Sequence, residues 1–589
     1  MRQVITLCVA LLLTALPMHS ARADGAAKGV SLSFRDIYRT THHIPSAPSQ
    51  KAYVFYFFTN ECPVSNLYAP ELNALVTRYS SRGVAFFAVD PSPNDTLQAV
   101  AAHARDFELL PVIVKDFDGS LTRALAPATT AQVVVLDRFG RVAYSGRIDD
   151  RYSVGLTKPT ATTHELKTAL DAILANRKPP ASVPASGCVI DMEPTTPQEA
   201  AHLSWKDVQP VFQSQCQPCH RPNGPAPFSL TNFHTATAMR EMIRQALVEY
   251  RMPPWSADPA VGDFANSRVM TPADRKLLLS WASQTPGAEA AEEEKPEPTS
   301  PWFGAQPDLI WEGSAEQTIP ATTEGNQGVF FEEVVDPHLT EDTWIQGFEV
   351  LPSNRKVVHH VTVYAIPLDE VDHTQVDRAA LGYLAAYVPG MPPYRYPESY
   401  AAKLLAGQKV YLQIHYTPNG SEQKDRTRIG VYLSKQKGVG QREVHDTSVR
   451  LLELDIPPEA RYHKVYAEER LPEARTLFSI LPHGHFRARS FELSAELPNG
   501  TKTVLISVPL YDFNWQMSYL FRVPVTFPAG TILRCKAHFD NSALNPSNPD
   551  PTKEVHWGIN SFDEMMFCYY DYVVADASTP TSSRGASSP

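Results

Sequence analysis

The sequence predicts a chain of several domains: an α/β domain, then an all-α domain, then two antiparallel β sandwiches in tandem. Three observations predict this order. Short apolar runs first alternate with helical patterns, a purely helical period follows, and the last part consists of short alternating segments separated by Pro, Gly and Asn. At 589 residues, the chain is also too long for a single hydrophobic core.

Residues 1–23 have the features of a signal peptide. Arg2 precedes an apolar run too short to span a bilayer, and Ala21-Arg22-Ala23 gives the small-x-small pattern of a cleavage site. We therefore expect an exported protein of the bacterial periplasm without a transmembrane segment. The formal net charge is −11 and becomes more negative when Arg2 and Arg22 are removed, which argues against nucleic acid as a partner.

Residues 24–178 are expected to form the α/β domain. Apolar runs such as "KAYVFYFFT" and "GVAFFAVD" alternate with helical patterns such as "APELNALVTRYSS", which predicts a mostly parallel sheet. Cys62 follows one such strand and precedes a helix, whose dipole lowers the pKa of a thiol. Cys188 lies in a linker expected at 179–195, and it either forms a redox pair with Cys62 or is unrelated to it.

The stretches "FTNECPVSNLYAPEL" and "VVVLDRFGRVAYSGRIDD" resemble the redoxin branch of the thioredoxin fold. The resemblance implies a thioredoxin-like domain with thiol redox or metal-relay chemistry at Cys62. The sequence lacks C-x-x-C, and it has Thr130-Ala131 where the family usually has a cis-proline beside the active cysteine. A purely structural role is therefore the alternative.

Residues 196–286 have a helical period, and Thr271 in "TPADRKLLLSWASQ" is expected to cap a helix. Within this region, Cys216, Cys219 and His220 form C-x-x-C-H, the attachment motif of c-type haem, in which two thiols bond to the porphyrin and the histidine binds iron. A thioredoxin-type thiol pair is the alternative, but it requires a βαβ setting.

The helical region resembles a small class I cytochrome c. This implies a second axial ligand near the end of a later helix, where "YRMPPW" supplies Met252. Three other methionines are rival candidates that are more typical of core positions: Met239, Met242 and Met270.

The acidic segment 287–301 is expected to be a linker, because "GAEAAEEEKPEPTSP" is rich in charge and proline. Alternating segments such as "QKVYLQIHYTPNG" follow and predict a first sandwich over 302–456 and a second over 457–576, divided near Pro457. Residues 577–589 are expected to be a disordered tail.

Pairs of histidines stand out in the predicted sandwiches. His483 and His485 in "LPHGHFRA" point to the same side of a strand, as two ligands of one metal would. His359 and His360 in "VVHHVTV" face opposite sides of a regular strand, so both can bind one metal only at a bulge or a strand end. A third pair, His42-His43, is expected to be inert surface.

The order of these histidines with His415 and Met565 resembles the copper type II monooxygenases, the family of peptidylglycine α-hydroxylating and dopamine β-monooxygenase, whose sandwiches are jelly-roll-like. Imidazole binds Cu(I) and Cu(II), and a thioether favours Cu(I), the state that reacts with O₂. The resemblance implies two copper ions. Their ligands would be His359, His360 and His415 for the first and His483, His485 and Met565 for the second.

The same resemblance implies a disulfide between Cys535 and Cys568 and a role for Tyr569 in the catalytic site. The family binds its peptide substrate with an Arg before the His-x-His and with an Asn and a Tyr after the Met, where this chain has Leu481, Phe567 and Tyr569. We therefore expect a small or peptide substrate that is rather apolar and is not a glycine-extended peptide. Aromatic residues of "YDFNWQMSYLF" either line this site or belong to the core.

These features predict an exported monooxygenase that hydroxylates a substrate C–H bond with O₂. Electrons are expected to arrive from a donor through the haem c domain, with the redoxin domain as a second candidate carrier and an external reductant such as ascorbate as a further source. The alternative is a non-catalytic periplasmic redox carrier or copper-handling protein.

Overall fold

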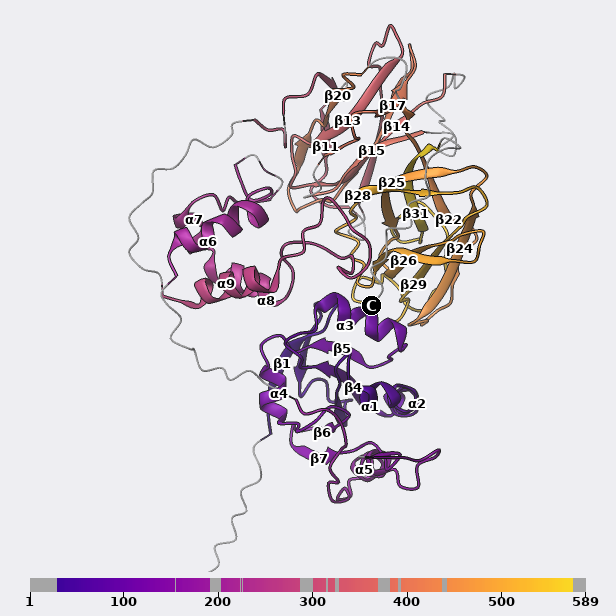
Figure 1. Cartoon of the computed structure of the whole chain (residues 1–589). Coiled ribbons are helices and arrows are strands. Elements are labelled where there is room, and N and C mark those ends of the chain that lie inside the picture. The colour runs from indigo at the N-terminus through magenta and orange to yellow at the C-terminus, as the bar shows by residue number, and fades with distance from the viewer. Residues whose placement is uncertain are drawn as a thin grey trace, which may run out of the picture.

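The computed structural model describes residues 29–575, except 154, 191–202, 223, 225, 286–299, 304, 314–315, 324–327, 369–381, 390–392 and 437–441. The expected signal peptide and tail lie outside the described residues. A thioredoxin-like α/β domain, a helical part and two β sandwiches follow one another along the chain (Figure 1). Within the described residues, no helix is long and apolar enough to cross a membrane.

The N-terminal domain has one central sheet in the order β5-β4-β3-β6-β7. Strands β3, β4 and β5 are parallel, and β6 and β7 are antiparallel. Its strands are β1 (Leu32–Arg35), β2 (Thr41–Ile44), β3 (Ala52–Phe57), β4 (Val84–Asp90), β5 (Val112–Lys115), β6 (Val133–Asp137), β7 (Val142–Gly146), β8 (Tyr152–Ser153) and β9 (Leu156–Thr157). Its helices are α1 (Pro63–Leu67), α2 (Ala69–Tyr79), the short 3-10 helix Ser80–Arg82, α3 (Leu97–Asp106), α4 (Ser120–Leu125) and α5 (Glu165–Leu174).

Strand β3 lies at the centre of this sheet because all its side chains are apolar or aromatic and all are buried. The chain passes from β3 directly into α1 with Cys62 at the helix N-cap, which is the thioredoxin-like arrangement. Residues expected in a linker after 178 also belong to the domain. The backbone N–H of Arg147 donates to Val183, and Thr130 pairs with Cys188, so this extended segment adds to the domain surface.

The middle part is helical, as the sequence predicts. It contains α6 (Trp205–Val211), a π-helical turn (Phe212–Cys216), α7 (Phe233–Ala238), α8 (Arg240–Val248) and α9 (Pro272–Ser283). The side chain of Thr271 accepts a hydrogen bond from the backbone N–H of Asp274 and caps α9, which confirms the predicted cap. Trp205, Phe212 and Trp281 form an aromatic core.

The connection between α8 and α9 leaves this helical core and packs on the second sandwich. Trp255 and Phe264 are buried in the core of that sandwich, and Phe264 forms a β-bridge with Phe521. Gln98 of α3 donates a hydrogen bond to the Trp255 carbonyl at 2.8 Å. The connection therefore contacts two other domains, which the sequence analysis does not predict.

The first sandwich consists of two sheets, antiparallel except for the parallel pair β17–β21, with a short additional pair β11–β19. One sheet has the order β10-β20-β13-β17-β21 with β16 attached to β13, and the other has the order β12-β18-β14-β15. The strands are β10 (Leu309–Glu312), β11 (Gln317–Ile319), β12 (Val329–Val335), β13 (Thr343–Leu351), β14 (Val358–Ala365), β15 (Gly382–Tyr387), β16 (Tyr394–Arg395), β17 (Tyr400–Leu404), β18 (Val410–Tyr416), β19 (Gln423–Asp425), β20 (Arg428–Leu433) and β21 (Arg442–Glu443).

The second sandwich has sheets in the orders β22-β31-β25-β28 and β24-β29-β26-β27. Its strands are β22 (His445–Leu451), β23 (Asp455–Ile456), β24 (His463–Arg470), β25 (Arg475–His483), β26 (Ala488–Glu496), β27 (Lys502–Val508), β28 (Tyr519–Phe527), β29 (Ile532–Phe539), β30 (Val555–His556) and β31 (Met566–Val574). Because β22 pairs with β31, this sandwich begins at His445, earlier than the expected boundary near Pro457.

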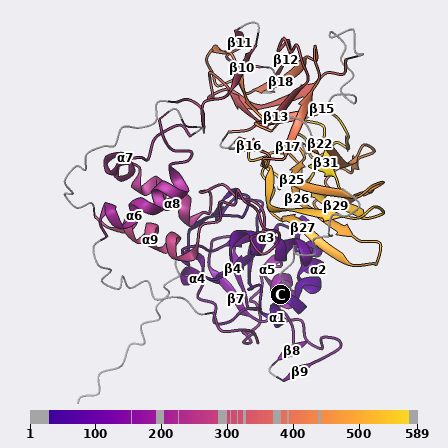
Figure 2. The same cartoon turned by 45° about the horizontal axis from the view of Figure 1, so that its top comes forward.

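The thioredoxin-like domain contacts the second sandwich directly. Arg105 donates to Ser507 at 3.0 Å, and Lys464 forms a 2.6 Å ion pair with Glu108. In both views α3 lies against the β26–β29 end of this sandwich, while the helical part lies to one side (Figure 2).

Candidate metal centres and thiol site

The first histidine cluster forms where β14 pairs with β18. His360 lies opposite His415, and the register shifts between Val358 and His360, so His359 is an extra residue on β14. This is the bulge that two adjacent histidines need in order to share a metal, and its presence confirms that expectation. One nitrogen of each of the three rings lies within 4.8 Å of the others, and His359 Nδ1 is 3.0 Å from His360 Nδ1.

The three rings are neutral near pH 7. Burial lowers the pKa of His359 and His360, and burial together with His359 lowers the pKa of His415 to about 3. Both ring nitrogens of His415 are buried, and neither has a hydrogen-bond partner among the described residues. Leaving a buried polar group unpaired is costly, so a cation bound by the cluster would stabilise this arrangement.

Packing fixes the orientation of the His415 ring. Phe330 stacks on it with a centroid distance of 4.3 Å and an interplanar angle of 4°. A Cβ atom at Gly328 would lie 1.7 Å from His415 Nε2, so only glycine fits at this position. This close approach at Nε2 favours Nδ1 as the ligand atom, the same nitrogen through which His359 and His360 approach each other.

The second histidine pair lies at the end of β25. The rings of His483 and His485 are 5.4 Å apart; His483 is the last residue of β25 and His485 lies beyond its end, so the alternation of a strand does not by itself bring the two rings together. His483 Nδ1 lies 2.6 Å from Gln516 Oε1, and His485 Nδ1 lies 3.2 Å from the Asp563 carbonyl oxygen. Because an acceptor oxygen places the ring proton on each Nδ1, each Nε2 remains available to a metal. Burial lowers the pKa of both rings, that of His485 to about 3.

Glu564 connects the third expected ligand to this pair. Its buried carboxylate accepts hydrogen bonds from the backbone N–H groups of His485, Arg487 and Met565. His485 and Met565 donate to the same oxygen, Oε1, so Met565 lies beside His485. The sequence analysis missed Glu564 and Gln516. A polar side chain inside an aromatic stretch, as in "DEMMF" and "FNWQM", is the signal that could have revealed them.

A cleft opens between the two sandwiches near the second pair, although neither histidine of the pair lines it. Leu481 and Tyr569 line it, and the Tyr569 ring lies 6.2 Å from the His483 ring. Asp446 and Asp571 also line the cleft, opposite each other on β22 and β31, and burial raises the pKa of Asp571 to about 6. The cleft is therefore less apolar than the sequence analysis predicts, because strand pairing brings in two carboxyl groups that are distant in sequence.

The aromatic residues of "YDFNWQMSYLF" divide between two places. Tyr511, Tyr519 and Phe521 belong to the core of the second sandwich, as one alternative predicts. Phe513 and Trp515 line a groove where the thioredoxin-like domain, the α8–α9 connection and the second sandwich meet.

The C-x-x-C-H motif follows the π-helical turn of the helical part. The backbone N–H groups of Cys219 and His220 donate to the Cys216 carbonyl at 3.2 and 2.8 Å, which gathers the three residues in one turn. His220 Nδ1 lies 3.1 Å from the Phe228 carbonyl oxygen, which leaves Nε2 as a ligand atom. These residues fit a covalently attached haem.

The methionines of the helical part differ in burial. Met270 is buried in its core, Met239 packs against that core, and the Met242 side chain is exposed. Met252 lies after α8, and its backbone N–H donates to the Ala246 carbonyl at 3.3 Å. Its role as an iron ligand stays a prediction.

Cys62 and Cys188 meet beside Thr130, which answers a question that the sequence leaves open. Thr130 Oγ1 donates to Cys62 Sγ at 2.9 Å and accepts a hydrogen bond from the Cys188 backbone N–H at 2.8 Å. Burial raises the pKa of Cys62, but hydrogen bonds from Thr130, Ser65 and Cys188 outweigh burial and lower it to about 7. Thr130, at the position where the redoxin family usually has a cis-proline, therefore stabilises the thiolate form of Cys62.

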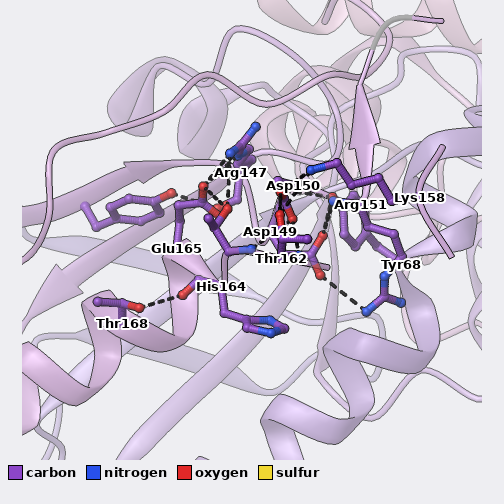
Figure 3. Close-up of polar contacts among 12 residues, drawn as sticks. Tyr68, Arg147, Asp149, Asp150, Arg151, Lys158, Thr162, His164, Glu165 and Thr168 are labelled. Carbon is purple, nitrogen blue, oxygen red and sulfur yellow. Dashed lines mark hydrogen bonds and ion pairs between the residues drawn. The ribbon is translucent and has the colours of Figure 1, made fainter. Parts of the chain in front are cut away.

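A second group of metal-type side chains lies in the thioredoxin-like domain. Glu71, Asp149 and His164 offer ligand atoms within 4.8 Å of one another. Figure 3 shows Arg151 beside Asp149, and its Nη2 lies 3.1 Å from Glu71 Oε2 and 3.4 Å from Asp149 Oδ2. Because the guanidinium supplies the positive charge that these carboxylates need, we interpret the group as an ion-pair cluster.

Cys535 and Cys568 lie on β29 and β31, in opposite sheets of the second sandwich. Both are buried thiols in this structure. Burial is the larger cause that raises the pKa of Cys535 well above its usual range, and the neighbouring Cys568 thiol is the second. The disulfide between them stays a prediction.

No protein-family model matches the chain, and no curated protein matches it. Among solved structures, a hypothetical protein from Sinorhizobium meliloti 1021 is 24% identical, with a TM-score of 0.26 over 28% of this chain and 93% of its own. A secreted Mycobacterium tuberculosis disulfide oxidoreductase homologous to E. coli DsbE is 18% identical, with a TM-score of 0.19 over 25% and 95%. The thioredoxin-like assignment rests on the strand order and the position of Cys62.

Proposed function

We propose that this protein is an exported copper-dependent monooxygenase that hydroxylates a substrate C–H bond. The observation that carries the proposal is the pair of histidine clusters, in which five neutral rings, buried at His415 and His485 and half-buried at the other three, offer nitrogen atoms to two centres. One copper ion would be held by His359, His360 and His415, and the other by His483, His485 and Met565. When bound, copper supplies one-electron redox chemistry and reactivity with O₂.

The chain prepares the second centre by fixing its ligands. Gln516 and the Asp563 carbonyl hold the ring protons on Nδ1, so the Nε2 atom of each ring is left available as a ligand. Glu564 fixes the backbone of His485 and Met565 together. Leu481 and Tyr569 border the adjoining cleft, where the reacting C–H bond of a substrate would lie.

Hydroxylation consumes one O₂, two electrons and two protons, and it yields one water and the hydroxylated product. Cys216 and Cys219 would attach a haem and His220 would ligate its iron; when bound, this group would supply one-electron transfer, and an external reductant such as ascorbate would be the source of the electrons. Arg221, next to this motif, donates to the Trp302 carbonyl of the first sandwich at 3.2 Å and also lines the cleft between the two sandwiches, which supports docking of the motif against the first sandwich.

The first experiment measures the copper and haem content of the full, copper-loaded exported chain. We expect two copper ions and one haem, and one copper ion in His483→Ala. The matched control is His43→Ala, which removes an exposed histidine of β2 and should keep both ions. Copper content that is unchanged in His483→Ala, or absent from the native chain, would contradict the proposal and favour the non-catalytic carrier. Oxygen uptake coupled to hydroxylation then separates an enzyme from a copper-handling protein.

A second candidate function is thiol–disulfide exchange, favoured by the contact of Cys62, Thr130 and Cys188. The Cys62 thiolate would attack a substrate disulfide, and the Cys188 thiol would then resolve the mixed disulfide. The chain's two thiols become one disulfide, and the substrate disulfide is reduced to two thiols.

Thr130→Val is expected to raise the pKa of Cys62 from about 7 towards its ordinary value of 9, because the variant loses the hydroxyl that stabilises the thiolate. The pH dependence of thiolate ultraviolet absorbance, taken as a difference from Cys62→Ser, measures this change. Thr129→Val alters the neighbouring residue, whose hydroxyl bonds to the Ala185 carbonyl, and should leave the pKa unchanged. An equal pKa in both valine variants would remove the case for Thr130.

A further inference from the structure

We infer that the loop Asp512–Gln516, between β27 and β28, positions both metal centres and sets the distance between them. The inference rests on the proposed function, since it requires metal at both clusters. The new element is that a single loop of five residues contacts histidines of both sandwiches. The loop would thereby act as a shared support for two sites that belong to different domains.

Phe513 lies between the two clusters. Its ring stacks on His359 of the first sandwich with centroids 5.0 Å apart and an interplanar angle of 25°. The same ring meets His485 of the second sandwich edge to face, at 6.1 Å and 86°. One aromatic side chain therefore fills the space between a ligand of each centre, which fixes their separation and gives a chain of packed rings along which an electron can pass.

Two neighbours of Phe513 hold further ligands. The Asn514 side chain lies within reach of His359. Gln516 Oε1 lies 2.6 Å from His483 Nδ1. Phe513, Asn514 and Gln516 thus contact three histidines, and each contact orients a ring rather than binding the metal itself.

The loop is rigid enough for this role. The backbone N–H of Trp515 donates to the Asp512 carbonyl at 2.9 Å, and Gln516 Nε2 donates to the Phe513 carbonyl at 3.0 Å. From outside, Arg39 of the thioredoxin-like domain forms a 3.1 Å ion pair with Asp512. The two hydrogen bonds within the loop and the ion pair from the thioredoxin-like domain hold Phe513 in one place. The separation of the two centres therefore depends on the thioredoxin-like domain as well as on the two sandwiches.

The test measures the magnetic dipolar coupling between two Cu(II) ions by electron paramagnetic resonance, in the full chain loaded with copper and oxidised. We expect one narrow distance distribution in the native protein. In Phe513→Ala it should shift to longer distances and broaden while the copper content stays at two. Trp515 lines the same groove and has no ring contact to these histidines among the described residues. The control variant Trp515→Ala should therefore keep the native distance distribution.

The outcomes separate the two proposals. Fewer than two copper ions in the native chain would overturn the proposed function, and the inference with it. Two copper ions with the same distribution in the native protein and in Phe513→Ala would overturn the inference alone. If Phe513→Ala binds less copper, Phe513→Leu keeps apolar bulk and removes the flat ring, and an unchanged distribution in that variant would also overturn the inference.

Discussion

Replacing Glu564 with alanine is expected to lower the free energy of unfolding of the second sandwich by about 3–5 kcal/mol. The carboxylate is fully buried and accepts three backbone hydrogen bonds, so its removal leaves the N–H groups of His485, Arg487 and Met565 unpaired. Chemical unfolding followed by tryptophan fluorescence measures the change. The variant should also lose the second copper ion, because two of its ligands depend on this carboxylate.

The control and the pH dependence make this prediction specific. Glu554→Ala removes an exposed carboxylate of the same domain and should change stability by less than about 0.5 kcal/mol. Burial raises the pKa of Glu564 from 4.5 to about 7, so the folded state binds more protons than the unfolded state between these values. The stability contribution of this group therefore falls as pH rises from 4.5 to 7. Equal stabilities of the two alanine variants would contradict the role assigned to Glu564.

Lys115→Met is expected to destabilise the thioredoxin-like domain by about 3–5 kcal/mol. Lys115 Nζ lies 2.6 Å from Asp90 Oδ1, and the two residues are 5% and 0% exposed. Removal of the ammonium leaves Asp90 buried without its counter-charge. Burial raises the pKa of Asp90 and Lys115 opposes this shift, so the loss of Lys115 removes the main group that favours the charged carboxylate. Hydrogen exchange of β4 and β5 measures the loss within this domain.

An exposed ion pair of the same type provides the control. Lys424 lies 2.8 Å from Glu316, but both side chains are more than half exposed, so Lys424→Met should cost less than about 1 kcal/mol. The double variant Asp90→Asn, Lys115→Met should recover much of the lost stability, because it removes the unpaired charge. Equal losses for the buried and the exposed pair would show that burial does not set the strength of the Asp90–Lys115 interaction.

Local patterns carry most of what the sequence predicts about this fold. The alternation of apolar runs and helical periods predicts the three classes of domain, because each class is indicated by the spacing of apolar residues that are close together in the sequence. Two adjacent histidines require a bulge for a simple steric reason, and the bulge at His359 is present. The position of Cys62 at the start of a helix also follows from local sequence.

Contacts between distant segments could not be predicted in the same way. Thr130 touches Cys62 only because β6 lies beside β3 in the sheet, and nothing in the residues around Cys62 indicates this. Asp446 and Asp571 come together through the pairing of β22 with β31, whose register the sequence leaves open. The boundary expected near Pro457 differs from the structure for the same reason.

The α8–α9 connection limits how this protein can be divided. Trp255 and Phe264 lie in the core of a sandwich that begins more than a hundred residues later, and Asn266 donates to the Ser518 carbonyl at 2.8 Å. A fragment that ends after α9 would expose the side chains of Trp255 and Phe264 to solvent. A fragment that starts at the first sandwich would lack these two side chains in the hydrophobic core of the second. Recombination of genes at the apparent domain borders would therefore yield insoluble products, so these modules are expected to be inherited as one unit.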